Sequence, residues 1–231
     1  MSTYLRGALI EFMPTILIPL PNIIIFQYNP ETMTHTWSQP EAAGSGTGDT
    51  KGDPLAVKGS PGEQFSFTIA MDANDTIATG HPVVSQLAEA SGVYTRLAAL
   101  EMLMYPLSSG KSPLLGAASV SLGGKSSGIK RSVPAFKMPT VLFVWGPGRI
   151  VPVRLTGLTI TERLYDGLLN PTHAEAQLGL RVLTPEELKV DTDILGTLAN
   201  GAYVYTNTLR QALALLNLAN AVDGVVGMLP L

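Results

Sequence analysis

The sequence predicts an α+β fold in which a β-barrel or sandwich carries one packed helix and a helical C-terminal tail. Three observations predict it. Several short segments alternate apolar and polar residues with a period of two, which is typical of strands with one buried face. Residues 82–104 change to a spacing of three to four, which favours a helix, and the residues beyond Ile194 are rich in alanine and leucine.

The first half of the chain is expected to contain three strands. Residues 5–12 form the first strand, and residues 22–28 form the second because β-branched and aromatic side chains dominate that run. In residues 62–72, phenylalanine and isoleucine alternate with polar residues, which predicts a strand with one buried face. The helix over residues 82–104 follows, bent near Gly92.

The second half is expected to contain three more strands and two helical segments. Residues 140–146 are a continuous apolar run, typical of a buried strand, and residues 151–162 and 175–183 alternate again. Residues 184–187 read Thr-Pro-Glu-Glu, the pattern of a helix start. The tail beyond Ile194 is apolar on more than one face, so we expect another surface to cover it.

Two segments of glycine and small polar residues interrupt this plan, at residues 41–53 and 108–132. They have too few large apolar side chains to offset the entropy of ordering, so we expect flexible inserts. The domain outline is a β-domain over residues 1–190, with those inserts, and a helical extension over residues 191–231.

Composition excludes several classes of protein. The chain has 231 residues, of which 45% are hydrophobic and only 14% are charged. Globular proteins usually carry about 25% charged residues, so the shortfall predicts a surface partly covered by partners. A net charge of −3 gives no basic surface for nucleic acid.

The chain has no cysteine, so disulfides and cysteine-ligated metals are excluded. The apolar stretch near the N-terminus contains Pro14, Pro19 and Pro21 and is followed by no cleavage-site pattern, so we expect neither a secretory signal nor a membrane span there. The expected location is the cytoplasm where the protein is made, and then an assembled particle.

Two glycine-lysine-serine triplets invite a phosphate-binding interpretation. The one at residues 124–126 lacks the required earlier glycine, because that place is Ser119, and the one at residues 110–112 has Tyr105 there. Neither follows a buried strand and opens a helix, so flexible loops are the favoured interpretation.

Other catalytic and metal-binding patterns are equally weak. His35, His81 and His173 have no second histidine or cysteine at ligand spacing, and no nucleophile-elbow motif is present. The pair Glu186 and Glu187 suits a helix N-terminus. We therefore expect no cofactor, no metal and no enzymatic activity.

Two Asn-Pro corners are the most distinctive features of the sequence. Residues 22–31 read NIIIFQYNPE, and residues 162–171 read ERLYDGLLNP before the alternating segment at 174–183. An Asn-Pro pair ends a strand because proline has no N–H for the ladder. Each corner is either an ordinary turn or an assembly contact. Trp37 and Trp145 are expected to be core or interface anchors.

Together the two segments resemble the tube-like adaptor proteins of contractile injection systems, which are particles related to phage tails. In that family an F-Q-Y/F-N-P-E strand end comes early, and an E-x-x-Y/F-D-x-x-L-N-P-x-x-A corner leads into a late strand. The resemblance is strong over residues 22–31 and 150–190 and looser over residues 54–105.

The resemblance implies the split β-barrel of tail-tube proteins and a ring, sixfold in that family, that continues the inner tube. The implied partners are further copies of the chain, the inner tube protein and a spike-hub or cap protein, with sheath protein as a further candidate. The interface candidates are Phe26, Tyr28, Asn29, Pro30, Trp37, Glu162, Tyr165, Asn170, Pro171, Leu213 and Leu216.

Adaptors of this family commonly continue into a LysM module, whereas this sequence ends in an apolar helical tail. A cap-side adaptor at the distal end of the tube therefore remains an alternative to the baseplate adaptor. A free-standing β-domain that binds a carbohydrate or another ligand is the alternative from a different class.

Overall fold

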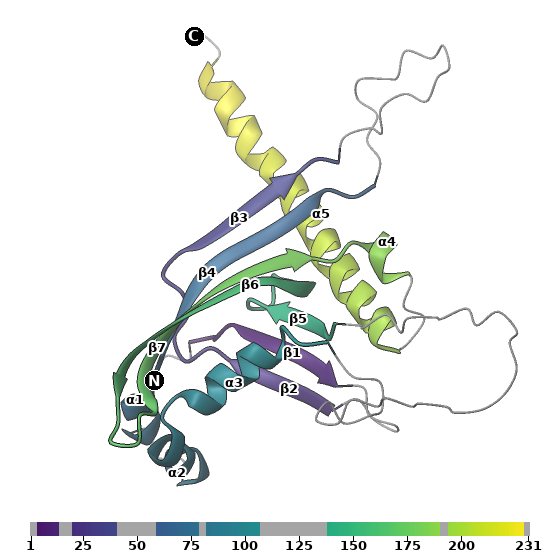
Figure 1. Cartoon of the computed structure of the whole chain (residues 1–231). Coiled ribbons are helices and arrows are strands. Elements are labelled where there is room, and N and C mark those ends of the chain that lie inside the picture. Colours follow the sequence, from purple (N-terminus) through teal and green to yellow (C-terminus); the bar gives the residue numbers. More distant parts are fainter. Residues whose placement is uncertain are drawn as a thin grey trace, which may run out of the picture.

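The chain folds around one seven-stranded antiparallel sheet with helices beside it (Figure 1). The computed structural model describes residues 4–13, 20–40, 59–78, 82–106, 138–189 and 194–228. The elements follow in the order β1 (Ala8–Met13), β2 (Leu20–Ile25), β3 (Met33–Ser38), β4 (Gly62–Asp72), α1 (Ala73–Ala78), α2 (Pro82–Ser91), α3 (Tyr94–Met102), β5 (Thr140–Val144), β6 (Ile150–Tyr165), β7 (Pro171–Val182), α4 (Pro185–Leu188) and α5 (Ile194–Met228).

The sheet is open. Its strand order is β2-β1-β5-β6-β7-β4-β3, so β2 and β3 are the two edges and do not pair with each other. The α+β class predicted from the sequence is confirmed. The expected closed outline is corrected in one respect, because the described strands form a single open sheet that neither closes into a barrel nor divides into the two sheets of a sandwich.

The open sheet is nevertheless strongly curved. Strands β6 and β7 lie between β5 and β4 in the sheet, yet the ring of Phe143 on β5 is 5.3 Å from the ring of Phe65 and 5.4 Å from that of Phe67, both on β4. Rings at this separation are in contact. The sheet therefore wraps around one core.

Period-two alternation decides which side chains enter that core. On β4, Phe65, Phe67 and Ile69 are buried, as the sequence predicts. On β6 the register shifts between Leu155 and Gly157, which resets the alternation so that Leu158 again faces the core.

The helical segment predicted over residues 82–104 consists of two helices, α2 and α3. They meet at Gly92, whose φ is +57° and where a Cβ atom would lie 2.1 Å from the carbonyl oxygen of Pro171. Leu97 and Leu100 of α3 are fully buried, whereas Leu87 of α2, at the same helical spacing, is half exposed.

Strand β3 and helix α1 were not predicted. Strand β3 is only six residues long and carries no buried aliphatic run, so its place in the sheet depends on its pairing with β4, in which His35 lies opposite Phe65. The two expected inserts, the two glycine-lysine-serine triplets and His81 lie outside the described residues.

Candidate functional site

The first Asn-Pro corner joins the two edges of the open sheet at one end. Phe26 follows β2 and is a core residue, 1% exposed, with its ring 5.6 Å from that of Phe67 on β4. The side-chain amide of Gln27 then pairs with the backbone of Asp72 at the end of β4: Nε2 donates to the carbonyl oxygen at 2.8 Å, and the Asp72 N–H donates to Oε1 at 3.0 Å. Arg96 on α3 also donates to Oε1, at 2.8 Å. Gln27 therefore links the segment after the edge strand β2 to the end of β4 and to α3, where no strand pairing does.

Asn29 fixes the N-terminal segment to this corner by two hydrogen bonds. Its Oδ1 accepts the N–H of Gly7 at 2.9 Å, and its Nδ2 donates to the carbonyl oxygen of Leu5 at 2.9 Å. The hydroxyl of Tyr28 donates to the carboxylate of Asp75 on α1, and this hydrogen bond is the main cause of a raised pKa for Tyr28. These contacts are all within the chain, so the corner stabilises the subunit by joining the N-terminal segment, β4 and α1.

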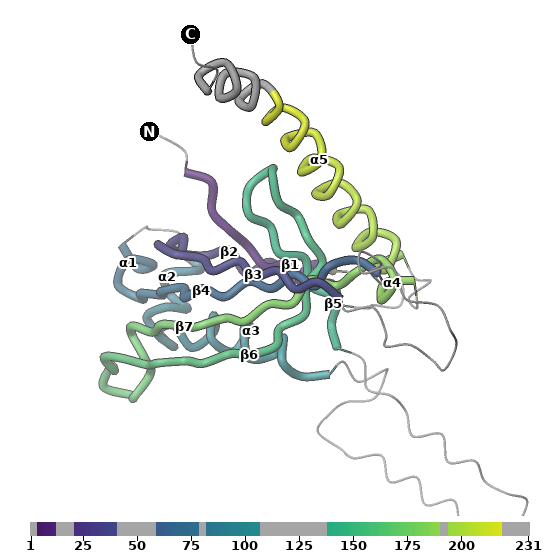
Figure 2. The backbone as a smooth tube through the Cα atoms, turned by 90° about the horizontal axis from the view of Figure 1, so that it is seen from above, coloured from purple at the N-terminus to yellow at the C-terminus, as the bar shows by residue number. Residues whose placement is uncertain are grey.

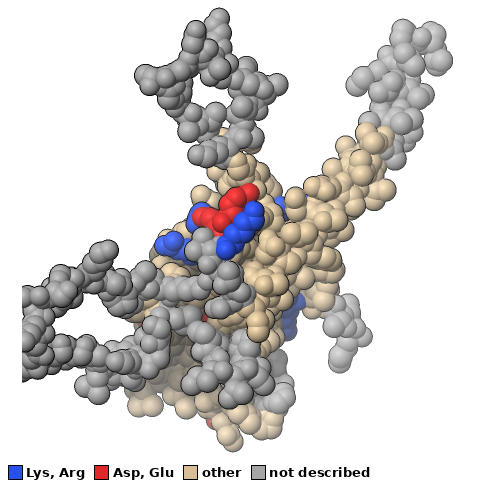
Figure 3. Space-filling model, turned by 90° about the vertical axis from the view of Figure 1, so that its right-hand side faces the viewer, with Lys and Arg blue, Asp and Glu red and all other residues tan. Residues whose placement is uncertain are grey.

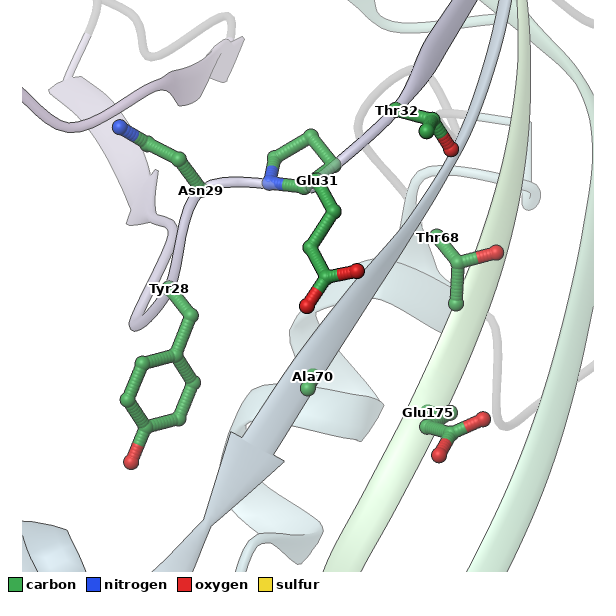
Figure 4. Close-up of a pocket in the computed structure, with 8 residues that line it drawn as sticks. Tyr28, Asn29, Glu31, Thr32, Thr68, Ala70 and Glu175 are labelled. Atoms are coloured by element: carbon green, nitrogen blue, oxygen red, sulfur yellow. The ribbon is translucent and has the colours of Figure 1, made fainter.

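A shallow pocket of about 480 Å³ lies beside this corner (Figure 4). Asn29 points away from it, whereas the carboxylate of Glu31 extends toward the strands. Pro30 and Tyr28 form part of the wall, and Glu175 on β7 supplies a second carboxylate.

The second Asn-Pro corner is the turn between β6 and β7, and Asp166 organises it. Its Oδ1 accepts the N–H groups of Leu168 and Asn170, each at 2.8 Å, and its Oδ2 accepts Nδ2 of Asn170 at 2.9 Å. Hydrogen bonds from Asn170 hold the pKa of Asp166 below its ordinary value, which keeps the carboxylate ionised. The carbonyl oxygen of Pro171 accepts the N–H of Val93, so the corner is fixed to the turn between α2 and α3.

Residues 164–169 of this turn, here called the β6–β7 tip, expose several large apolar side chains. Leu164 is 70% exposed, and Leu168 and Leu169 are each 80% exposed. Leu164 and Leu169 also have positive φ values of 54° and 65°, which residues other than glycine rarely adopt. Tyr165 is exposed as well, and its hydroxyl donates to the carboxylate of Glu162 at 3.3 Å.

A shallow groove of about 300 Å³ lies between the end of α3 and β6. Its lining, here called the α3 groove, consists of Glu101, Met104, Tyr105, Leu158 and Ile160. The leucine and isoleucine form the floor, since they also pack against the core, and Met104 and Tyr105 are partly exposed at the wall.

Helix α5 is attached to the sheet over residues 194–210, here called the anchored half. The hydroxyl of Thr206, 1% exposed, donates to the carbonyl oxygen of Ile150 at 2.7 Å and accepts the N–H of the same residue at 3.0 Å. Tyr205 donates to the carbonyl oxygen of Pro147 at 2.9 Å. Arg210 ends the anchored half with a two-point ion pair to Glu63 on β4, at 2.9 and 2.5 Å.

Glu63 is 2% exposed, and an aromatic cluster surrounds its ion pair. Nε2 of His35 lies 2.7 Å from the carboxylate, and the guanidinium of Arg210 lies 4.8 Å from the ring centroid of Trp37. Burial lowers the pKa of His35 below 6.5, although the Glu63 carboxylate acts in the opposite direction. Trp37 itself is 47% exposed, so it covers the cluster and also reaches the surface.

Residues 211–228 of α5, here called the projecting half, extend away from the sheet (Figures 1 and 2). Every side chain described there, from 211 to 218, is exposed. They include Leu213 at 56% and Leu216 at 68%. On the face drawn in Figure 3, most of the visible charged atoms lie in one small mixed cluster with a few others below it, and the described part of the projecting half carries none.

The β6–β7 tip, the floor of the α3 groove and the described part of the projecting half are largely apolar. In the parts of the chain that the structure describes, no group of three His, Asp or Glu side chains could hold a metal ion. His173 instead faces Asp72, with Nδ1 3.4 Å from Oδ2. None of the helices in the described ranges combines the length and apolar character that a transmembrane helix needs.

No protein-family model matches the chain, and no curated protein matches it.

The Asn-Pro pattern located the two corners, but it did not identify the side chains that make their hydrogen bonds. Gln27 makes three hydrogen bonds to Asp72 and Arg96, and Asp166 accepts three within its own turn, yet neither was among the predicted interface candidates. Glu63 and Arg210 were also missed, because 147 residues separate them and no local pattern marks either. A buried position in an alternating strand that carries a carboxylate is the one signal that could have identified Glu63.

Proposed function

We propose that the protein is a structural adaptor of a contractile injection particle. In this function it forms a ring that continues the inner tube and joins it to the spike hub of the baseplate. The fold would then be the split β-barrel of tail-tube proteins, with its opening between β2 and β3.

The observation that carries the proposal is the curved but open sheet. Among the described strands, β2 and β3 are edges with no further strand beside them, and an exposed edge favours pairing with another chain. Joining unlike edges of neighbouring copies is a head-to-tail contact, and such contacts close into a ring when the rotation allows it. A closed ring removes every edge, which a monomer with this sheet cannot do.

The projecting half of α5 supports a second contact, with a component above or below the ring. An apolar helix exposed on all sides is unfavourable in a free monomer, and contiguous exposed apolar surface marks a protein interface. Because this half leaves the sheet, it reaches beyond the subunit to which it belongs (Figure 2).

The projecting half also bears on which end of the tube is involved. If the protein is a cap-side adaptor, this helix is the segment that would contact a terminating partner. Electron micrographs of particles made with and without the protein distinguish the two positions. Loss of the baseplate supports the first, loss of the cap or an abnormal tube length supports the second, and normal particles would contradict both.

The interface itself can be tested with the double variant Leu213→Ser, Leu216→Ser. Both side chains are exposed, so we expect an unchanged fold by circular dichroism and a loss of incorporation into particles. The matched control is Leu198→Ser with Val204→Ser, which changes partly exposed apolar residues of the anchored half. Equal incorporation of both double variants would remove the projecting half from the interface.

The pocket beside Asn29 favours one function from a different class, a ligand-binding β-domain. Its two carboxylates, Glu31 and Glu175, and the ring of Tyr28 could contact the hydroxyl groups of a sugar. A stable monomer in sedimentation experiments, together with saturable sugar binding lost in Glu31→Gln, would favour this function over the adaptor.

A further inference from the structure

We propose that the β6–β7 tip of one copy inserts into the α3 groove of a second copy of this chain. The inference rests on the proposed function in that it assumes self-association. It names a contact separate from the edge strands and from the projecting half of α5.

The β6–β7 tip is unfavourable in a free monomer because Leu168 and Leu169 are each 80% exposed, so their apolar surface faces water. Leu164 and Leu169 also have positive φ values, a strained conformation that hydrogen bonds within the subunit hold in place. The exposed apolar surface points to a contact outside the subunit.

The tip is also preorganised. The carboxylate of Asp166 holds the backbone N–H groups of Leu168 and Asn170, and the carbonyl oxygen of Pro171 accepts the N–H of Val93. The hydroxyl of Thr172 donates to the carbonyl oxygen of Leu164 at 3.0 Å. A loop fixed in this way loses little entropy on binding, which is the advantage of a preformed contact.

The α3 groove fits such a contact in size and chemistry. Its volume of about 300 Å³ is roughly ten times the share of one water molecule in the liquid, which is room for leucine side chains. Leu158 and Ile160 give it an apolar floor, and Met104 and Tyr105 give it an adaptable wall.

Charge complementarity favours a second copy as the occupant. Glu101 at the groove has no cationic partner among the described residues. Arg163, next to the tip, is 57% exposed and makes only a long ion pair of 3.4 Å with Glu175. Docking the tip in the groove of another copy brings Arg163 of one copy toward Glu101 of the other, and this opposite-charge pair favours one orientation of the contact. The contact joins unlike surfaces, so it is head-to-tail, as a ring requires.

The absence of cysteine from the chain makes a cross-linking test direct. Leu168→Cys and Met104→Cys, each on the full chain with a tag of different size, are mixed and treated with a short bismaleimide. We expect a product that contains both tags in the mixture and little product from either variant alone. Thr208→Cys, an exposed position on the anchored half of α5, replaces Met104→Cys in the control mixture and should give no mixed product.

Each other outcome would overturn the proposal. A product from Leu168→Cys alone would mean that two tips meet, and equal products with the control would mean random collision. A charge exchange provides a second test: Glu101→Arg and Arg163→Glu should each weaken association several-fold, and the two together should restore it. No rescue would contradict the predicted pairing.

The test runs on the purified chain, so it is independent of the particle. If cross-linking fails while the protein is still incorporated into particles, the tip–groove contact is wrong and the adaptor function stands. If cross-linking succeeds while particles form normally without the protein, the contact stands and the adaptor function is wrong.

Discussion

The two halves of α5 belong to one continuous helix but lie in opposite environments. The anchored half buries Thr206 and ends in the Arg210–Glu63 ion pair, whereas every side chain described in the projecting half is exposed. The anchored half carries three threonines, two tyrosines and Arg210, whereas the projecting half has none of these residue types and carries four alanines and four leucines. Attachment combines polar side chains that find partners on the sheet with the buried Ala199 and with Tyr203, which packs against the core. Leucine and alanine content alone does not attach the helix.

Two truncations give the largest expected difference between the halves. Ending the chain before Ile194 removes Arg210 and leaves Glu63 buried without its cation, a change that costs about 3–5 kcal/mol by itself. Typical stabilities are only about 5–15 kcal/mol, so we expect a largely unfolded or aggregated product. Ending the chain after Gln211 should leave the urea midpoint unchanged. A folded first truncation would show that the anchored half is dispensable.

A single substitution isolates the ion pair. Arg210→Ala should lower the free energy of unfolding by about 3–5 kcal/mol, because Glu63 is 2% exposed and loses its main partner. The matched control is Arg181→Ala, which breaks a partly exposed ion pair with Glu187 and should cost about 0–1 kcal/mol. Urea denaturation measures both. Similar losses would mean that burial of Glu63 does not set the strength of the attachment.

The Thr206 hydroxyl tests a smaller part of the attachment. Thr206→Val keeps the side-chain shape but leaves both backbone groups of Ile150 without this partner, which should cost about 1–3 kcal/mol. Thr208→Val, at an exposed position two residues away, should change stability by less than about 0.5 kcal/mol. An equal effect on the thermal midpoint would remove the hydroxyl from the attachment.

The smallest expected effect is a pH dependence at His35, which faces Glu63 and has Arg149 and Arg210 nearby. Its pKa is lowered in the folded protein, so between that value and about 6.5 the unfolded chain binds more protons. The free energy of unfolding should therefore fall as the pH drops below about 6.5, and level off below the folded pKa. His35→Gln should lack this component. Identical pH profiles for the two proteins, measured between pH 5 and 7 by chemical denaturation, would show that His35 does not titrate in this way.

Local patterns predicted most strands and the turn between α2 and α3. Phe65, Phe67 and Ile69 alternate with polar residues, and that alternation is enough to place them on the buried face. Gly92 marked the bend, because the close approach of Pro171 there leaves no room for a Cβ atom.

Other features had no local signal. Strand β3 forms because it pairs with β4, and the sheet is open because β2 and β3 do not pair with each other. The sequence of one segment does not show which other strand it pairs with. The exposure of Leu87 shows the same limit, because helical spacing identifies a face of α2 but not whether another element covers it.

The sequence by itself determined the α+β class, the two Asn-Pro corners and the apolar helical tail. These depend on backbone propensity and on the period of apolar residues, which act over a few neighbours. Only the tertiary structure decided that Gln27 links the end of β2 to the end of β4, that Glu63 meets Arg210 across 147 residues, and that α5 is half anchored and half free. Those outcomes depend on side chains that are distant in sequence and brought together by the curvature of the sheet.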